Sequence, residues 1–201
     1  MNRLIRIVSL ITTVLIVGGC NLLPETPPPP SEHDLGQLAD FAPSSQLPQP
    51  VTLTGVDAPS WLEGRQIRYR RLSREPSVIQ AYARHQWVAP PPELLERYIE
   101  QRLERASGSM DSARQSPWRL SLMLDGFEQT FSGSERSHAV IRFRAELRSP
   151  AGAVFARKTF VQRKRTAPEV DGAVTGLSTV ADGAVTDLEQ WLAAQMQKHD
   201  A

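Results

Sequence analysis

The chain has 201 residues, which is enough for one large domain or two small ones. Charged residues make up 22% and hydrophobic residues 40%, a globular composition, and the balance of 23 Lys and Arg against 22 Asp and Glu argues against a nucleic-acid-binding protein. The single cysteine excludes an intramolecular disulfide framework, an iron–sulfur cluster and a cysteine-rich zinc site within one chain.

Residues 1–19 have the features of a lipoprotein signal peptide. Two arginines precede an apolar run from Ile7 to Val17, which is shorter than the roughly 20 apolar residues of a membrane-spanning helix. Val17-Gly18-Gly19-Cys20 then resembles a bacterial lipobox, in which the cysteine sulfur receives a diacylglyceryl group and the leader is cut before it. The resemblance implies that Cys20 becomes the lipidated N-terminus, and we expect no other cofactor. An ordinary signal peptide followed by a free thiol, or an uncleaved anchor, is the alternative.

The residue after the cysteine bears on which membrane holds the protein. In the sorting pattern of enteric lipoproteins, an aspartate at this position favours the inner membrane, and Asn21 stands there instead. We therefore expect the protein in the inner leaflet of the outer membrane, facing the periplasm. Several acyl chains on Cys20 would anchor it stably, whereas a single chain binds a membrane only marginally.

Residues 20–50 are predicted to be a tether between the lipid and a folded domain. Eight of the 16 prolines lie here, including the run Pro27–Pro30. Proline blocks helices and central strands and favours the extended polyproline II conformation, which rises about 3.1 Å per residue. The segment His33–Gly36 interrupts the tether, and we interpret it as a local docking segment.

The first half of the domain, residues 51–201, predicts three strands and a helix. Alternating apolar residues indicate strands at Val51–Val56, Arg65–Leu72 and Ser77–Ala83, the last two joined as a hairpin. After three prolines, apolar residues at three- and four-residue spacing indicate a helix over Glu93–Ala106. Its charged residues, Arg102 among them, are expected on the opposite, solvent-facing side.

The second half repeats this order with a clearer pattern. Alternation predicts half-buried strands at Trp118–Asp125, Ala139–Arg148 and Ala153–Arg163, with a turn around Pro150. A long amphipathic helix is expected over Asp171–Lys198. The prediction is an α+β domain in the order β-β-β-α-β-β-β-α, with both helices packed on one face of an antiparallel sheet.

Catalytic and metal-binding patterns are missing from the sequence. The four histidines, His33, His85, His138 and His199, have no partner at ligand spacing, and there is no nucleophile elbow, phosphate-binding loop or dinucleotide fingerprint. We therefore expect neither an enzyme nor a metal site.

Two basic stretches stand out, Arg65–Arg74 and Arg157–Arg165. Strand alternation makes them solvated outer faces, or else a patch for lipid headgroups or for an acidic partner. An export signal makes nucleic acid an improbable partner.

Two segments carry a resemblance to a known family. Residues 56–70, with Arg65-Gln66-Ile67 after a tryptophan and a leucine, resemble a stretch of the ABC-type transport auxiliary lipoproteins (PqiC-like). Residues 82–91 do so as well, with a tryptophan shortly before a proline-bearing helix start. The family often has a first strand near the tether, and His33–Leu38 is the segment that could supply it here.

The resemblance implies a non-enzymatic accessory subunit of an intermembrane lipid transport system. Its partners would be a mammalian-cell-entry (MCE) domain protein that bridges the periplasm, together with the permease and ATPase of an ABC transporter. The lipid-anchored subunit would dock that bridge at the outer membrane. Candidate partner-binding residues are Arg65, Gln66, Arg68 and Arg70, and a homo-oligomer is compatible with this role. The alternative is a structural lipoprotein that scaffolds envelope machinery without lipid transport; a periplasmic hydrolase lacks a catalytic motif.

Overall fold

The computed structural model describes residues 28–36, 45–107, 117–134 and 136–199. The elements in chain order are β1 (Ser31–His33), β2 (Val51–Asp57), the 3-10 turn η2 (Ser60–Leu62), β3 (Gln66–Arg71), β4 (Ile79–Trp87), α2 (Pro91–Ser107), β5 (Trp118–Phe131), β6 (Ser137–Arg148), β7 (Val154–Thr166) and α3 (Val170–His199). From β2 onward this is the predicted order of strands and helices, which confirms the α+β class. The leader, Cys20 and Asn21 lie outside the described residues.

One sheet of seven strands contains all of these strands, and it is mixed rather than antiparallel as expected. β5, β6 and β7 form a long antiparallel meander, and β3 and β4 form the predicted hairpin. β2 and β3 both run parallel to β5, β2 along its first half and β3 along its end. The chain bends through η2 after Pro59 and continues in the same direction, so β2 and β3 form no hairpin with each other. Alternation shows which residues share a face but not the direction of the neighbouring strand.

Several strands extend past their predicted ends. β4 reaches Trp87 and not Ala83, and β5 reaches Phe131 and not Asp125. The backbone of β5 is irregular between Leu124 and Gly126, where the register shifts against β6 and breaks the simple alternation. The alternation of apolar residues in the sequence therefore ends at this irregularity, although the strand itself continues to Phe131.

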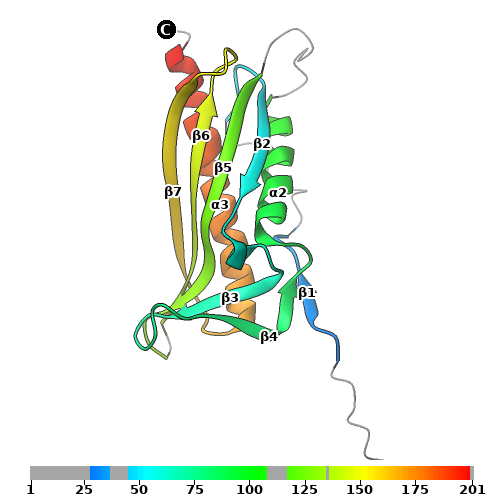
Figure 1. Ribbon diagram of the computed structural model, residues 1–201, viewed down its shortest axis with the longest axis vertical. Coiled ribbons are helices and arrows are strands. Elements are labelled where there is room, and N and C mark those ends of the chain that lie inside the picture. Colours follow the sequence, from blue (N-terminus) through cyan, green and yellow to red (C-terminus); the bar gives the residue numbers. More distant parts are fainter. Residues whose placement is uncertain (1–27, 37–44, 108–116, 135, 200–201) are drawn as a thin grey trace, which may run out of the picture.

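Both helices cover one face of the sheet, as predicted (Figure 1). α3 packs on the meander and α2 lies along β2. Alternate residues of β6, from Ala139 to Leu147, are buried against apolar side chains of α3 that include Leu177, Leu188 and Leu192. The alternation read from the sequence therefore gives the correct inner face of the meander.

A buried ion-pair cluster joins the two helices, where the sequence predicted a solvated arginine. The side chain of Arg102 on α2 is only 2% exposed, and its guanidinium donates to both carboxylate oxygens of Glu189 on α3, at 2.6 and 2.9 Å. A further N–H donates to Asp182, which also accepts from the hydroxyl of Tyr98. The position of Arg102 on α2 faces α3 and not solvent, so the expectation for this residue is wrong.

The segment predicted as a tether contacts the domain at two places. β1 adds to the edge of the sheet in parallel to β4, and the Glu32 carboxylate accepts hydrogen bonds from Arg65 and Gln86. Further along, Leu47 is buried and Gln49 accepts a hydrogen bond from the indole of Trp118 at 2.8 Å. Of the segment His33–Gly36, which was expected to dock, only His33 belongs to this strand, and Leu35 packs partly buried against the core. Gln37 and Leu38 lie outside the described residues.

Candidate functional site

The face of the sheet opposite the helices carries a dense array of charged side chains. Its residues alternate with the core residues of the meander, because successive side chains of a strand point to opposite faces. Within the described residues, no helix or strand covers this side of the meander (Figure 1). We call it the open face, and define it by the outward side chains of β5, β6 and β7: Met123, Asp125, Arg142, Arg144, Glu146, Arg157, Thr159, Val161, Arg163 and Arg165.

Two ion-pair groups organise the centre of the open face. The guanidinium of Arg144 donates to both oxygens of Asp125 at 2.8 Å, in a two-point contact between neighbouring strands. One strand further, Glu146 accepts from Arg157 at 2.7 and 2.8 Å and from Arg148 at 2.5 Å. These arginines hold the pKa values of Asp125 and Glu146 below their ordinary range, chiefly by hydrogen bonding to the charged carboxylates.

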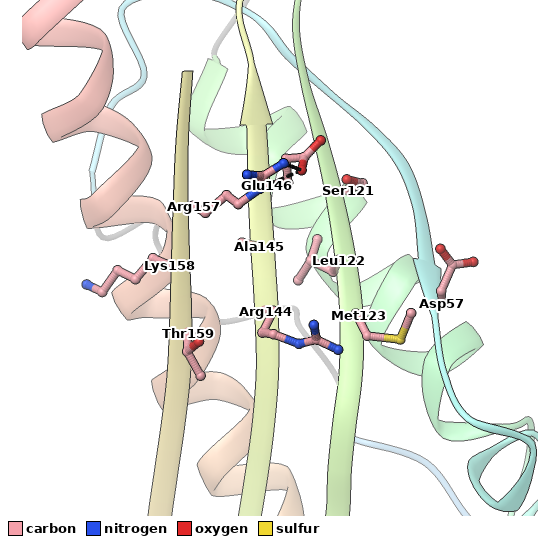
Figure 2. A pocket seen from close by; sticks show the side chains of 10 residues that line it. All are labelled: Asp57, Ser121, Leu122, Met123, Arg144, Ala145, Glu146, Arg157, Lys158 and Thr159. Atoms are coloured by element: carbon pink, nitrogen blue, oxygen red, sulfur yellow. Dashed lines mark hydrogen bonds and ion pairs between the residues drawn. The ribbon is translucent and has the colours of Figure 1, made fainter. Parts of the chain in front are cut away.

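A hollow of about 480 Å³ lies on the open face and extends from β2 to β7. In Figure 2, Arg144 points toward Met123, and Arg157 meets Glu146 at one end of the hollow. Asp57, at the end of β2, lies on its far side. The hollow therefore combines an apolar thioether with charged groups on both sides, which suits the side chains of a protein partner.

The open face has more positive than negative groups. Arg142 and Arg165 form no ion pair within the described residues, and Arg163 contacts the ring of His138 at 3.1 Å. Burial, together with the nearby Arg163 and Arg165, lowers the pKa of His138, so this imidazole adds little charge near neutral pH. The surplus arginines lie on β6 and β7, with Arg142 at the edge of the paired centre.

The basic stretch Arg157–Arg165 divides between the two faces of β7. Arg157, Arg163 and Arg165 belong to the open face. Lys158 lies instead with its ammonium 4.7 Å from the ring of Phe160, and Lys164 contacts Thr179 of α3. The arginines of the stretch are therefore the basic side chains that belong to the open face, and Lys158 also lines its hollow.

Of the four predicted partner-binding residues, Arg65 and Arg70 make contacts inside the protein. The Nε of Arg65 donates to the carbonyl of Trp87 at 2.9 Å, and its guanidinium pairs with Glu32. Arg70 donates to Glu128 on β5 at 3.1 Å and to the carbonyl of Pro76 at 2.9 Å. Both arginines tie strands together, so their charge is largely used within the fold.

Gln66 and Arg68 remain closer to the predicted role. Gln66 is exposed, and its side-chain oxygen accepts a hydrogen bond from Arg68 at 3.1 Å. The Nε of Arg68 is buried and has no hydrogen-bond partner within the described residues. The structure therefore does not unite the four residues in one surface, and their partner binding stays a prediction.

The fold brings together two histidines that lie far apart in the sequence. His33 of β1 and His85 of β4 stack with their rings 5.3 Å apart, and the Nε2 of one lies 3.0 Å from the Nδ1 of the other. Sequence spacing gave no signal of this pair, because it depends on the parallel addition of β1. Across the described part of the chain, no group of three or more His, Cys, Asp or Glu residues is placed to hold a metal ion.

The described helices are all too short or too polar to cross a membrane.

Comparisons with solved structures find proteins of the same fold at low sequence identity. Protein XCC0632 from Xanthomonas campestris matches with a TM-score of 0.66 and 19% identity, covering 78% of this chain and 90% of that one. A crystal structure described only as an uncharacterized protein matches with a TM-score of 0.58 and 13% identity, covering 84% of this chain and 99% of that one. At these identities the likeness establishes the fold alone.

Comparison with curated proteins gives no match. The family described as the ABC-type transport auxiliary lipoprotein component matches residues 35–189. This range begins just after β1 and ends within α3, so it includes the open face, the whole of α2 and the first part of α3. The chain therefore belongs to the family of ABC-type transport auxiliary lipoprotein components.

Proposed function

We propose that this protein is the lipid-anchored, non-enzymatic accessory subunit of an intermembrane lipid transport system. In this proposal, Cys20 holds the chain in the inner leaflet of the outer membrane and the open face docks a periplasmic MCE-domain protein. That partner bridges to the permease and ATPase of an ABC transporter. Membership of the transport auxiliary family supports the association with an ABC system.

The observation that carries the proposal is the uncovered, charged open face. A protein interface typically has a less polar centre and a polar rim, and this surface offers Met123 beside the hollow with arginines around it. Surplus positive charge on β6 and β7 favours an acidic partner, because complementary charge speeds association and disfavours wrong partners. The surface is also rigid, since three long paired strands present it.

The chemistry of the hollow supports binding rather than catalysis. Asp125 and Glu146 are each paired with arginines, which keeps both carboxylates charged and their pKa values low. A general acid or base works best with a pKa near the operating pH, and these pairs move both groups in the opposite direction. Their arrangement suits a fixed pattern of charge that a partner recognises.

Site-specific crosslinking in membranes tests the proposal. A photo-crosslinkable residue at Thr159, on the open face, should capture an MCE-domain protein. The same residue at Glu100, exposed on α2, is the matched control and should not. Capture of cell-wall or other assembly proteins at Thr159 without any MCE-domain protein would favour the scaffolding alternative and contradict the transport role.

Charge reversal gives a second, independent test. Arg142→Glu should reduce co-purification of the partner about tenfold, because it replaces attraction with repulsion at the edge of the paired centre. Arg97→Glu on the exposed side of α2 makes the same change of charge outside the open face and should leave co-purification intact. Equal losses from both variants would show that overall charge, and not the open face, governs the association.

A further inference from the structure

A second hollow, of about 510 Å³, lies at the end of the domain where the β3–β4 turn meets the end of β5. It is distinct from the open face: its wall includes Tyr69 and Tyr82, which lie on the hairpin, and Pro168, which precedes α3. In Figure 1 this region is the lower corner of the molecule, where the β3–β4 and β5–β6 turns come together. Nothing in the proposed docking role uses it.

An aromatic cluster forms one wall of this hollow. The rings of Tyr69 and Tyr82 lie 4.9 Å apart, and Phe131 packs edge-on against Tyr69 at 5.8 Å. The hydroxyl of Tyr82 donates to Gln129 within the fold. Its polar group is therefore satisfied internally, and its ring is what the cluster offers to a ligand.

Two arginines of the β3–β4 region complete the hollow. The guanidinium carbon of Arg71 lies 5.9 Å from the ring centres of both Tyr69 and Phe131, a cation–π arrangement that orients it. Within the described residues, neither Arg71 nor Arg74 has an ion pair or a side-chain hydrogen bond. Both guanidinium groups thus keep their N–H donors available, beside the hydroxyls of Ser73 and Ser134.

One acidic group near the hollow offsets part of this positive charge. Burial raises the pKa of Tyr82 to about 12, and Glu169 adds to that rise while Arg71 opposes it, so both charges lie near the ring. Arg71 and Glu169 therefore both act on the wall of the hollow, and Glu169 offsets part of the positive charge there.

We propose that this hollow binds a phosphodiester group through Arg71 and Arg74, with the aromatic cluster receiving the carbon chain next to the phosphate. A phosphodiester carries one negative charge, and arginine forks match the geometry of its oxygens. The headgroup region of a phospholipid and a soluble glycerophosphodiester share this chemistry. The proposal stands apart from docking on the open face and does not require it.

Binding to the full-length protein in a neutral maltoside detergent tests the proposal by calorimetry. The probes are soluble glycerophosphoglycerol, phosphatidylglycerol in mixed micelles and inorganic phosphate. We expect saturable binding of at least one diester, weakened at least about tenfold by the double variant Arg71→Gln, Arg74→Gln, because charged hydrogen bonds are lost. The double variant Arg97→Gln, Lys198→Gln removes the same charge from exposed helix positions and should retain binding.

The outcomes separate the sources of the ligand. Binding of both diesters assigns the site to the phosphodiester itself, and binding of phosphatidylglycerol alone assigns it to a membrane lipid. Arg74 makes no side-chain hydrogen bond or ion pair within the described residues, so Arg74→Gln should weaken binding while the melting temperature stays close to that of the wild type. Tighter binding of inorganic phosphate than of any diester, equal losses in both double variants, or no saturable binding would overturn the proposal.

Discussion

The Arg102 cluster gives the sharpest prediction about stability. Arg102→Met keeps most of the apolar stem but removes the guanidinium that joins α2 to α3. The Glu189 carboxylate, fully buried, then loses the two hydrogen bonds that the Arg102 guanidinium donates to it. Breaking a buried pair in this way costs about 3–5 kcal/mol of unfolding free energy. In a domain of this size, that corresponds to a fall in melting temperature of about 6–20 °C.

Thermal and urea unfolding followed by circular dichroism measure this loss. Arg97→Met lies on the exposed side of the same helix, and its unfolding free energy should stay within about 0.5 kcal/mol of the wild type. The double variant Arg102→Met, Glu189→Leu removes both charges and should recover most of the loss, because an apolar pair of similar volume often replaces a buried ion pair without cost. A loss below about 1 kcal/mol for the single variant, or no recovery in the double, would refute the reasoning.

Three further predictions concern the anchor and two titrating sites. Cys20→Ala should leave an unlipidated, uncleaved or soluble precursor in membrane fractionation; unchanged partitioning with a cleaved N-terminus would contradict the lipobox. Asp125→Asn with Glu146→Gln should lower stability at neutral pH and flatten its decline below about pH 4, because carboxylates with lowered pKa values stabilise the fold above their unfolded-state pKa and lose that contribution in acid. Urea unfolding at pH 7 and pH 3.5 measures this, and an unchanged acid slope would count against it. Arg163→Gln should raise the pKa of His138 in an NMR titration, though not fully to 6.5, since burial is the larger cause; no change would place the cause elsewhere.

The sequence predicts those parts of the fold where one face of an element is buried. On β6, every second residue from Ala139 to Leu147 is nearly inaccessible, so the period of two is unbroken and the strand and its faces follow directly. α3 is predicted to within a residue at each end for the same reason, since its apolar stripe faces the meander along most of its length. In these segments, the continuous burial of one face requires apolar residues at regular spacing, and that spacing is visible in the sequence.

The features that the sequence did not predict depend on contacts between distant segments. Arg102 looks like any charged residue on an amphipathic helix, and only the arrival of Glu189 from α3 makes its burial possible. The parallel direction of β2 and β3 follows from the route of the chain through η2, which leaves no periodic signal. The open face was visible as alternating charges on β6, but its ion pairs require the register that places Asp125 beside Arg144.

The position of β1 links the tether to the architecture of the domain. While β1 stays paired with β4, only residues 20–30 separate the proposed lipid anchor from the sheet, which spans roughly 30 Å if extended at about 3.1 Å per residue. If β1 detached, the chain up to the buried Leu47 would become available and the reach would more than double. Glu32 holds β1 through Arg65 and Gln86, and the carbonyl of His33 accepts from the backbone of Val88. If Cys20 is the anchor, as proposed, the pairing of β1 with β4 limits the length of chain between the lipid and the sheet, and Arg65 contributes to that limit by holding Glu32.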